Sequence, residues 1–126
     1  LNMTNKLHTS KRTQSIFSSL GNSLGLPPYI LSKLAIALSI KKGKINPDDL
    51  KTDNEGLELS RQTIFAEHDL MFKALIINTE GKAISDDEYF PEIVKAHLDR
   101  GAKLLEEEKR YSKDFYNHLC NLDMNI

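Results

Sequence analysis

Two groups of cationic and hydroxyl side chains in the first part of the chain have the chemistry needed to bind phosphate. Arginine and lysine, together with the hydroxyls of serine and threonine, supply most contacts that proteins make to the phosphate oxygens of DNA. The residues that meet this description are Ser10, Lys11, Arg12, Thr13, Lys33, Lys41, Lys42 and Lys44. They predict a surface that grips a DNA backbone, with little sequence preference because phosphates carry no sequence information.

The sequence offers no comparable set of residues for catalysis. It contains no His-Glu-x-x-His pair, no Cys-x-x-Cys pair and no glycine-rich phosphate loop. His97 lies on an apolar stripe, which is typical of a core histidine. Cys120 has no basic neighbour to hold a thiolate, and His118 does not share a helical face with it. We therefore expect no catalytic residue, no metal and no cofactor, and a protein that is not an enzyme.

The charges of the chain are divided unequally along its length. Residues 1–46 carry seven basic side chains and no acidic one, whereas residues 47–126 carry ten basic and eighteen acidic side chains. Such an asymmetry indicates a basic part that faces a polyanion, with nucleic acid as the first candidate. The alternative is that the basic part folds against acidic partners within the same chain.

Length and composition are those of one globular domain of 126 residues, 40% apolar and 28% charged. We expect residues 1–126 to form a single helical domain, with residues 1–46 facing DNA and residues 47–126 forming an acidic helical part. One cysteine and no visible secretory leader favour a cytoplasmic protein. The apolar run 24–40 is too short and too interrupted to span a bilayer.

Apolar periodicity predicts an all-α, mainly helical fold of four to five helices. The first two helices are expected over residues 13–22 and 28–42, with Pro27-Pro28 between them and Gly43 as the second C-cap. A third is expected over residues 66–80, with Leu70, Met71, Ala74, Leu75 and Ile77 as its buried stripe. Ser85-Asp86-Asp87-Glu88 predicts the start of a fourth, which continues past residue 105 toward residue 122.

The first two helices also have the rhythm of a ribbon-helix-helix core. In that alternative, residues 5–13 form one short strand that pairs across a dimer and carries Lys11 and Arg12. The other alternative is a plain helical hairpin whose lysines are solvated.

The helix over residues 28–42 is apolar around almost its whole circumference, and such a helix must be buried all round. A chain of this size suggests that a second copy covers part of it. We therefore predict a symmetric homo-oligomer, either a dimer or a homotetramer made of dimers, with Leu31, Leu34, Ala35 and Leu38 at the contact.

Four stretches of the sequence resemble the DndE family of DNA sulfur-modification proteins. They are Lys11–Gln14, Leu26–Ser39, Gly56–Leu59 and His97–Gly101. The resemblance covers nearly the whole chain, although these stretches contain no short chemical motif that would name a catalytic residue.

The resemblance implies a bacterial cytoplasmic protein of the DNA phosphorothioation machinery, which replaces a non-bridging phosphate oxygen with sulfur. This member would be an accessory DNA-binding subunit beside a cysteine desulfurase, an iron–sulfur protein and an ATPase. Because the modified atom belongs to the backbone itself, a nicked duplex is the expected preferred substrate. The alternative is a protein-interaction adaptor of the same complex, whose acidic helices bind the enzyme subunits and whose DNA contact is incidental.

Overall fold

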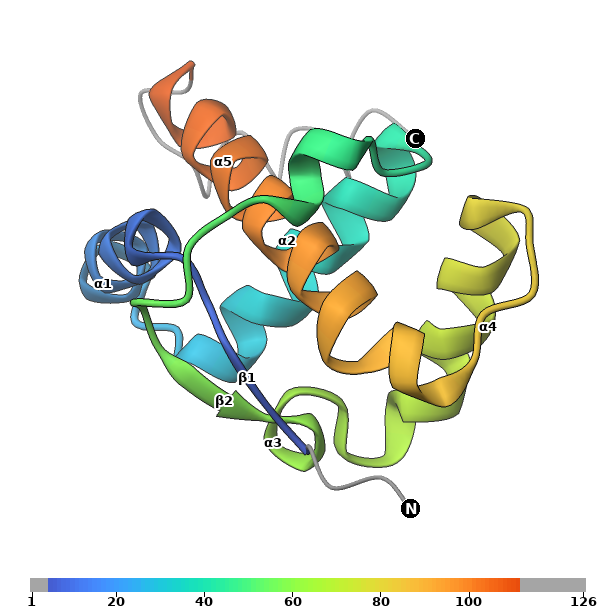
Figure 1. Ribbon diagram of the computed structural model, residues 1–126. Coiled ribbons are helices and arrows are strands. Elements are labelled where there is room, and N and C mark those ends of the chain that lie inside the picture. Colours follow the sequence, from blue (N-terminus) through green and yellow to red (C-terminus); the bar gives the residue numbers. More distant parts are fainter. Residues whose placement is uncertain (1–4, 112–126) are drawn as a thin grey trace, which may run out of the picture.

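The computed structural model describes residues 5–111, which fold almost entirely into helices (Figure 1). The elements in chain order are β1 (Lys6–His8), α1 (Lys11–Leu24), α2 (Pro28–Lys42), the 3-10 helix η1 (Pro47–Leu50), β2 (Glu58–Ser60), α3 (Arg61–Phe65), the 3-10 helix η2 (Ala66–His68), α4 (Asp69–Glu80), the π-helical segment η3 (Glu88–Ile93) and α5 (Val94–Arg110). The predicted mainly helical fold is confirmed. His118 and Cys120 lie outside the described residues.

Local signals set the ends of α1 and α2. The Ser10 side chain caps α1 by accepting from the Thr13 amide at 3.1 Å, and Gly25 ends the helix in the left-handed conformation. Helix α1 is therefore two residues longer at each end than the predicted 13–22. Helix α2 has the predicted bounds, and its axis turns 112° from that of α1. No single helix within residues 5–111 is long and apolar enough to cross a membrane.

The crossing of α2 and α5 is the centre of the fold (Figure 1). At the crossing the backbone of Gly101 in α5 meets the backbone of Ala35 in α2. A Cβ atom placed on Gly101 would lie 1.7 Å from the Ala35 carbonyl oxygen, which no side chain could tolerate. Glycine is therefore required at this position, and it fixes how closely the two helices approach.

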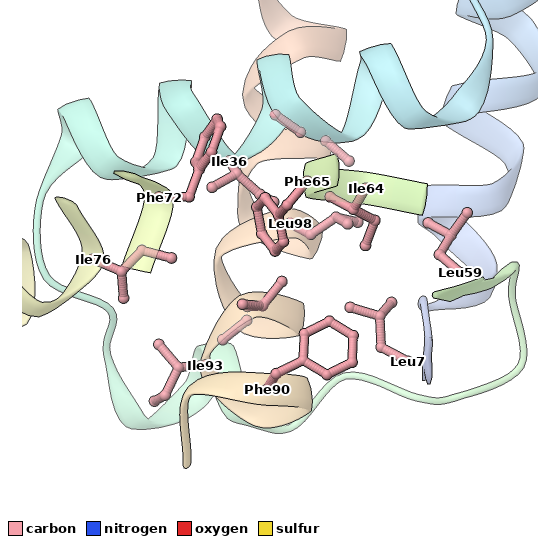
Figure 2. Close-up of a cluster of buried hydrophobic side chains, with 14 of the residues drawn as sticks. Leu7, Ile36, Leu59, Ile64, Phe65, Phe72, Ile76, Phe90, Ile93 and Leu98 are labelled. Carbon is pink, nitrogen blue, oxygen red and sulfur yellow. The ribbon is translucent and has the colours of Figure 1, made fainter. Parts of the chain in front are cut away.

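The hydrophobic core lies on the side of this crossing that faces α3, α4 and the two strands. Figure 2 shows Ile36 from α2 and Leu98 from α5 gathered with side chains from both strands, α3, α4 and η3. The other labelled residues are Leu7, Leu59, Ile64, Phe65, Phe72, Ile76, Phe90 and Ile93. The Phe65 and Phe72 rings pack with their centroids 5.1 Å apart, which joins α3 to α4.

The short N-terminal strand exists, but it pairs within its own chain. Strand β1 runs antiparallel to β2, with Leu7 opposite Leu59 and both side chains buried. Lys11 and Arg12 lie in the first turn of α1 rather than on a strand. The ribbon-helix-helix alternative, in which the strand carries these two residues and pairs with a second copy, therefore does not match the structure.

Helix α4 presents a different face to the core from the one predicted. Its buried residues are Phe72, Ile76 and Glu80, whereas Leu70 and Met71 are 79% and 51% exposed. The predicted buried stripe was wrong because apolar residues lie on both sides of this helix, so periodicity could not select the inner one. The predicted single helix over residues 66–80 is also interrupted, since Ala66 takes a positive φ and η2 precedes α4.

Arg61, the first residue of α3, connects the start of α4 to the segment that precedes η3. Its guanidinium donates to Asp69 and Asp86 at 2.8–3.0 Å and lies over the Tyr89 ring. The hydrogen bonds from Arg61, and then the one from Lys73, lower the pKa of Asp86 to about 2. The predicted helix start is confirmed just before it, because the Ser85 hydroxyl accepts from the Glu88 amide and the Glu88 carboxylate accepts from the Ser85 amide.

We predict that Gly101→Ala destabilises the chain although alanine is the better helix former. Helix propensity would stabilise the variant by about 1 kcal/mol. The clash with the Ala35 backbone should outweigh this gain, giving a net loss of about 1–3 kcal/mol in the free energy of unfolding. Urea denaturation followed by circular dichroism measures it.

Lys103→Ala on the exposed side of α5 is the matched control and should change stability by less than about 0.5 kcal/mol. A Gly101→Ala variant as stable as the original chain would contradict the described crossing.

Candidate nucleic-acid interface

The predicted phosphate-binding lysines and arginine form two exposed groups in the structure. The α1 cluster, Lys11 and Arg12, lies in the first turn of α1, and the α2 cluster, Lys41, Lys42 and Lys44, lies at the end of α2 and just beyond it. Lys33 stands apart from both on α2, where its ammonium lies over the Tyr29 ring at 5.5 Å from the ring centroid.

The two clusters flank the second half of α5. Arg12 forms an ion pair with Glu106 of α5 at 3.1 Å. On the other side, a groove of about 540 Å³ separates α2 from α5, with Lys41 and Lys42 on one wall and Leu104 and Glu107 on the other. The two clusters, about 30 positions apart in the sequence, therefore lie on opposite sides of α5, with Glu106 and Glu107 between them.

Acidic residues compensate only some of these charges. Arg12 is paired with Glu106, and Lys6 on β1 is paired with Glu58 at 3.2 Å. Within residues 5–111, no carboxylate forms an ion pair with the side chain of Lys11 or with any lysine of the α2 cluster. Compensation within residues 5–111 therefore applies to Arg12 and Lys6, whereas those lysines have no ion pair in this part of the chain.

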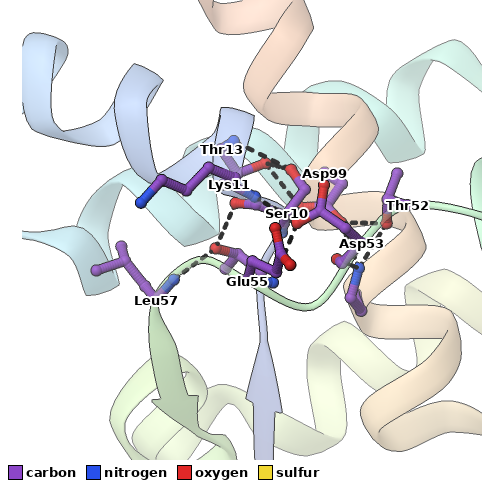
Figure 3. A network of polar contacts seen from close by, with 10 residues as sticks. Ser10, Lys11, Thr13, Thr52, Asp53, Glu55, Leu57 and Asp99 are labelled. Atoms are coloured by element: carbon purple, nitrogen blue, oxygen red, sulfur yellow. Dashed lines mark hydrogen bonds and ion pairs between the residues drawn. The ribbon is translucent and has the colours of Figure 1, made fainter.

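The hydroxyls of Ser10 and Thr13 are structural. Both residues are buried, and Thr13 donates to the Asp99 carboxylate at 2.6 Å while the Ser10 amide donates to it at 3.1 Å (Figure 3). A phosphate cannot reach either hydroxyl in this conformation.

Exposed polar side chains lie elsewhere on α1. A groove of about 680 Å³ runs beside the helix and is lined by Lys11, Gln14, Ser15, Ser18 and Asn22. Helix α1 contains no acidic residue, so these hydroxyl and amide groups extend the α1 cluster without adding negative charge.

Asp99 is the group that holds the start of α1. Its carboxylate is 1% exposed and also accepts from the Thr52 hydroxyl at 2.6 Å and the Lys95 ammonium at 2.7 Å. A buried carboxylate is tolerated when donors saturate it in this way. Next to it, the Lys11 amide donates to Asp53 at 2.8 Å, and this hydrogen bond is the main cause that lowers the pKa of Asp53 (Figure 3).

Arg100, the next residue along α5, holds the end of α2. Its guanidinium donates to the Ser39 carbonyl at 2.7 Å, to the Lys44 carbonyl at 3.0 Å and to the Gly43 carbonyl. The Ser39 carbonyl lies in the last turn of α2 and also accepts from the Gly43 amide, whereas the Gly43 and Lys44 carbonyls lie just beyond the helix. A cation at this place also suits the negative end of the helix dipole. Asp49 of η1 lies 3.7 Å from the same guanidinium.

His97 is buried behind Arg100, as its place on the apolar stripe predicted. Its Nε2 lies 3.0 Å from Glu80 of α4, and its Nδ1 lies 2.8 Å from the Ser39 hydroxyl. Burial lowers the pKa of His97, so the imidazole is neutral: Nε2–H donates to the Glu80 carboxylate and Nδ1 accepts from Ser39. No group of histidine, cysteine, aspartate and glutamate within residues 5–111 has the arrangement of a metal site.

The predicted oligomer contact is divided between the inside and the outside of the chain. Leu31 and Ala35 are completely buried by their own chain, mainly against α5. Leu34 is 40% exposed, and Leu38 is partly buried in the groove beside α5. A second copy could reach only Leu34 and Leu38 of the four.

Sequence analysis did not select Asp99 and Arg100. They lie inside His97–Gly101, one of the stretches that carried the family resemblance. Apart from Lys95, four positions before Asp99, their partners are between 47 and 89 positions away. The available signal was two adjacent opposite charges inside an apolar helix pattern, which indicates charged groups that need partners from neighbouring elements.

Comparison with models of protein families matches residues 6–113 to DndE, described as DNA sulphur modification protein DndE. Among solved structures, the chain is similar to the crystal structure of DndE from Escherichia coli B7A, involved in DNA phosphorothioation modification. The TM-score is 0.66 at 19% identity, over 83% of this chain and 99% of that chain. A DndE mutant with two glycine-to-lysine substitutions gives a TM-score of 0.62 at 19% identity and the same coverage. The search of curated protein sequences finds no match.

The buried His97 predicts how stability depends on pH. An unfolded histidine binds a proton near pH 6.5, whereas the folded chain keeps His97 neutral. The unfolded state then binds more protons, so the free energy of unfolding should fall as the pH drops below about 6.5, by up to roughly 1.4 kcal/mol per pH unit.

Urea denaturation between about pH 7.5 and pH 5.5 tests this, and the loss should be smaller in His97→Gln, which cannot take the proton. The exposed His8→Gln variant should keep the original pH dependence. Stability that rises toward pH 5.5 would instead indicate a protonated His97 paired with Glu80.

Proposed function

Since the chain belongs to the DndE family of DNA sulphur modification proteins, we propose that it is an accessory, non-catalytic DNA-binding subunit of the bacterial phosphorothioation machinery. In this proposal it acts in the cytoplasm and grips the DNA backbone largely without sequence preference. It brings the strand to the proteins that carry out the sulfur chemistry, namely a cysteine desulfurase, an iron–sulfur protein and an ATPase.

The observation that carries the proposal is the α2 cluster. Lys41, Lys42 and Lys44 are exposed and have no ion pair with residues 5–111, although Glu107 and Glu108 line the same groove as Lys41 and Lys42. We propose that these three ammonium groups are available to an outside partner. Three lysines within four positions at a fixed helix end make a concentrated positive potential, and a DNA backbone is the polyanion that such a site attracts.

The α1 cluster is the weaker part of the proposed DNA-binding surface, because one of its two charges is already paired. Lys11 is free of ion pairs with the described residues, but a phosphate would have to displace Glu106 to reach Arg12. The pair is solvent-exposed and therefore worth about 1 kcal/mol or less, which a phosphate can replace. We propose Ser15 and Ser18 as the hydroxyl donors of this face in place of Ser10 and Thr13. Lys33 would make a separate, peripheral phosphate contact.

A nicked duplex is the proposed preferred substrate. Sulfur replaces an oxygen of the backbone linkage itself, and a nick opens that linkage and lets the duplex bend. Two basic clusters on either side of α5 would be suited to two backbone segments that meet at an angle.

A second function, that of a protein-interaction adaptor, is favoured by the outer face of α4. Leu70 and Met71 are more than half exposed there, and Leu75 is 44% exposed beside them. Three large apolar side chains on one helix face typically mark a protein contact. In this function the acidic part of the chain would bind the enzyme subunits and DNA contact would be incidental.

We predict that Lys41→Gln/Lys42→Gln weakens DNA binding and flattens its salt dependence. The logarithm of affinity should fall with the logarithm of salt at a slope of about −0.9 per phosphate neutralised, so the double variant should lose up to roughly 1.8 of that slope. All sequences should be weakened alike, and the binding preference for nicked over intact duplex should be measured in the same titration.

Lys6→Gln/Lys82→Gln removes the same amount of charge elsewhere on the surface. It should leave the slope unchanged, because Lys6 is already paired with Glu58 and Lys82, which follows α4, belongs to neither cluster. Lys11→Gln/Arg12→Gln should have a smaller effect than the α2 double variant, because Glu106 already compensates Arg12. An equal salt dependence of DNA affinity in all three variants would refute the proposed DNA face and leave the protein-interaction adaptor as the proposed function.

We propose further that the protein is a homo-oligomer, a dimer or a homotetramer, whose contact includes Leu34 and Leu38. Leu34→Asp should dissociate it, because a buried unpaired charge at a contact costs on the order of 3–5 kcal/mol, while the single chain tolerates a charge at this exposed position. Light scattering at micromolar concentration measures the mass. Leu70→Asp on α4 is the matched control: dissociation by Leu70→Asp alone would move the contact to α4, and a monomeric original chain would exclude the oligomer.

A further inference from the structure

Two adjacent residues of α5, Asp99 and Arg100, hold the two elements that carry the basic clusters. Successive residues of a helix are 100° apart, so neighbours on α5 point to different neighbouring elements. Asp99 binds the start of α1, and Arg100 binds the end of α2. The α1 cluster begins one residue after Ser10. The α2 cluster lies in the segment whose backbone carbonyls, including that of Lys44, accept from Arg100.

We propose that Asp99 and Arg100 are positioning residues for DNA binding, which set the separation of the α1 cluster and the α2 cluster. This inference rests on the proposed function, since it concerns how the same basic face is held. We assign neither residue a contact with DNA, because Asp99 is buried and the guanidinium of Arg100 already donates to the end of α2.

Asp99 fixes the α1 cluster through two hydrogen bonds to the first turn of the helix. The Ser10 amide and the Thr13 hydroxyl are donors from α1, whereas Thr52 and Lys95 are donors from the loop after η1 and from α5 itself. The carboxylate is therefore shared between a part that carries the cluster and a part that does not. Loss of its charge should loosen the start of α1, because the Ser10 and Thr13 donors then lose a charged acceptor, whereas the weakened contacts of Thr52 and Lys95 lie outside the α1 cluster.

Arg100 holds the backbone of the α2 cluster in place although the three lysines of the cluster repel one another. Lys41, Lys42 and Lys44 repel one another, and Gly43 between them is the residue type that constrains a backbone least. The guanidinium joins three carbonyls from both sides of that glycine, at Ser39, Gly43 and Lys44. A lysine could not replace this planar fork, although it would keep the charge.

Positioned clusters favour binding because less conformational freedom is lost when DNA arrives. If Asp99 and Arg100 act in this way, each should matter to DNA binding only through its own cluster. A residue that simply stabilised the whole fold would affect both clusters equally. The two cases differ in a double-mutant cycle.

The experiment measures DNA affinity for Asp99→Asn and Arg100→Lys, each alone and combined with Lys11→Gln/Arg12→Gln or with Lys41→Gln/Lys42→Gln. We expect Asp99→Asn to couple with the α1 variant by at least about threefold and to be additive with the α2 variant, where independent sites add within roughly twofold. Arg100→Lys should show the reverse pattern. Additive results in all four combinations, or equal coupling to both clusters, would overturn the inference.

Thr13→Val keeps the inference testable if Asp99→Asn does not fold. It removes one α1 donor from Asp99 and should reproduce the coupling to the α1 cluster, whereas Thr52→Val removes a donor outside α1 and should not. Matching results for the two threonine variants would overturn the inference.

The proposed function and this inference fail in different ways. If the lysine variants alone leave DNA affinity unchanged, the proposed DNA face is wrong. If those variants weaken binding but the cycles are additive, only the positioning role of Asp99 and Arg100 is wrong.

Discussion

The contact between the Gly101 and Ala35 backbones is the constraint on which the rest of the structure depends. The two helices touch there without room for a single extra carbon atom, so α5 can occupy only one position along α2. Every neighbour of α5 is placed relative to that point: the core side chains on one side, and on the other the two clusters of positive charge. Helix α2, although apolar around most of its circumference, is buried by its own chain on one face, which carries Leu31, Ala35 and Ile36, and is exposed on another at Tyr29 and Leu34.

Buried polar groups next to this contact determine which elements pack against each side of α5. His97, Asp99 and Arg100 precede Gly101, and each binds a different element: α4 through Glu80, the start of α1, and the end of α2. Removing one partner from such a group is costly, because an unsatisfied buried charge remains. The same few residues thus determine how α1, α2 and α4 pack on α5 and where the exposed lysines of the two clusters stand.

The sequence predicted those features that are encoded locally. Pro28 and Gly43 mark the bounds of α2, Ser85 and Glu88 form the expected cap, and the exposed lysines of the α2 cluster follow from a run of like charges. It failed where the outcome depends on distant partners. The Ser10 and Thr13 hydroxyls have the chemistry of phosphate donors, but in the structure the Thr13 hydroxyl donates to Asp99, 86 positions away, and the Ser10 hydroxyl is bonded to Thr13. Helix α4 has apolar residues on both faces, and only its packing against Phe65 decides that Phe72 is the one turned inward. Except for Lys95, which lies four positions before Asp99 in α5, the partners of Asp99 and Arg100 likewise come from other helices and loops, which no spacing within α5 reveals.

Lysine footprinting of the full chain tests the central claim most directly. The protein is acetylated briefly with and without excess nicked duplex, and the modification of each lysine is read by mass spectrometry. The account predicts that DNA protects Lys11, Lys41, Lys42 and Lys44, while Lys51 and Lys82 react equally in both samples. Protection of Lys51 and Lys82 with no protection of the two clusters, or no protection anywhere under conditions where DNA is bound, would contradict it.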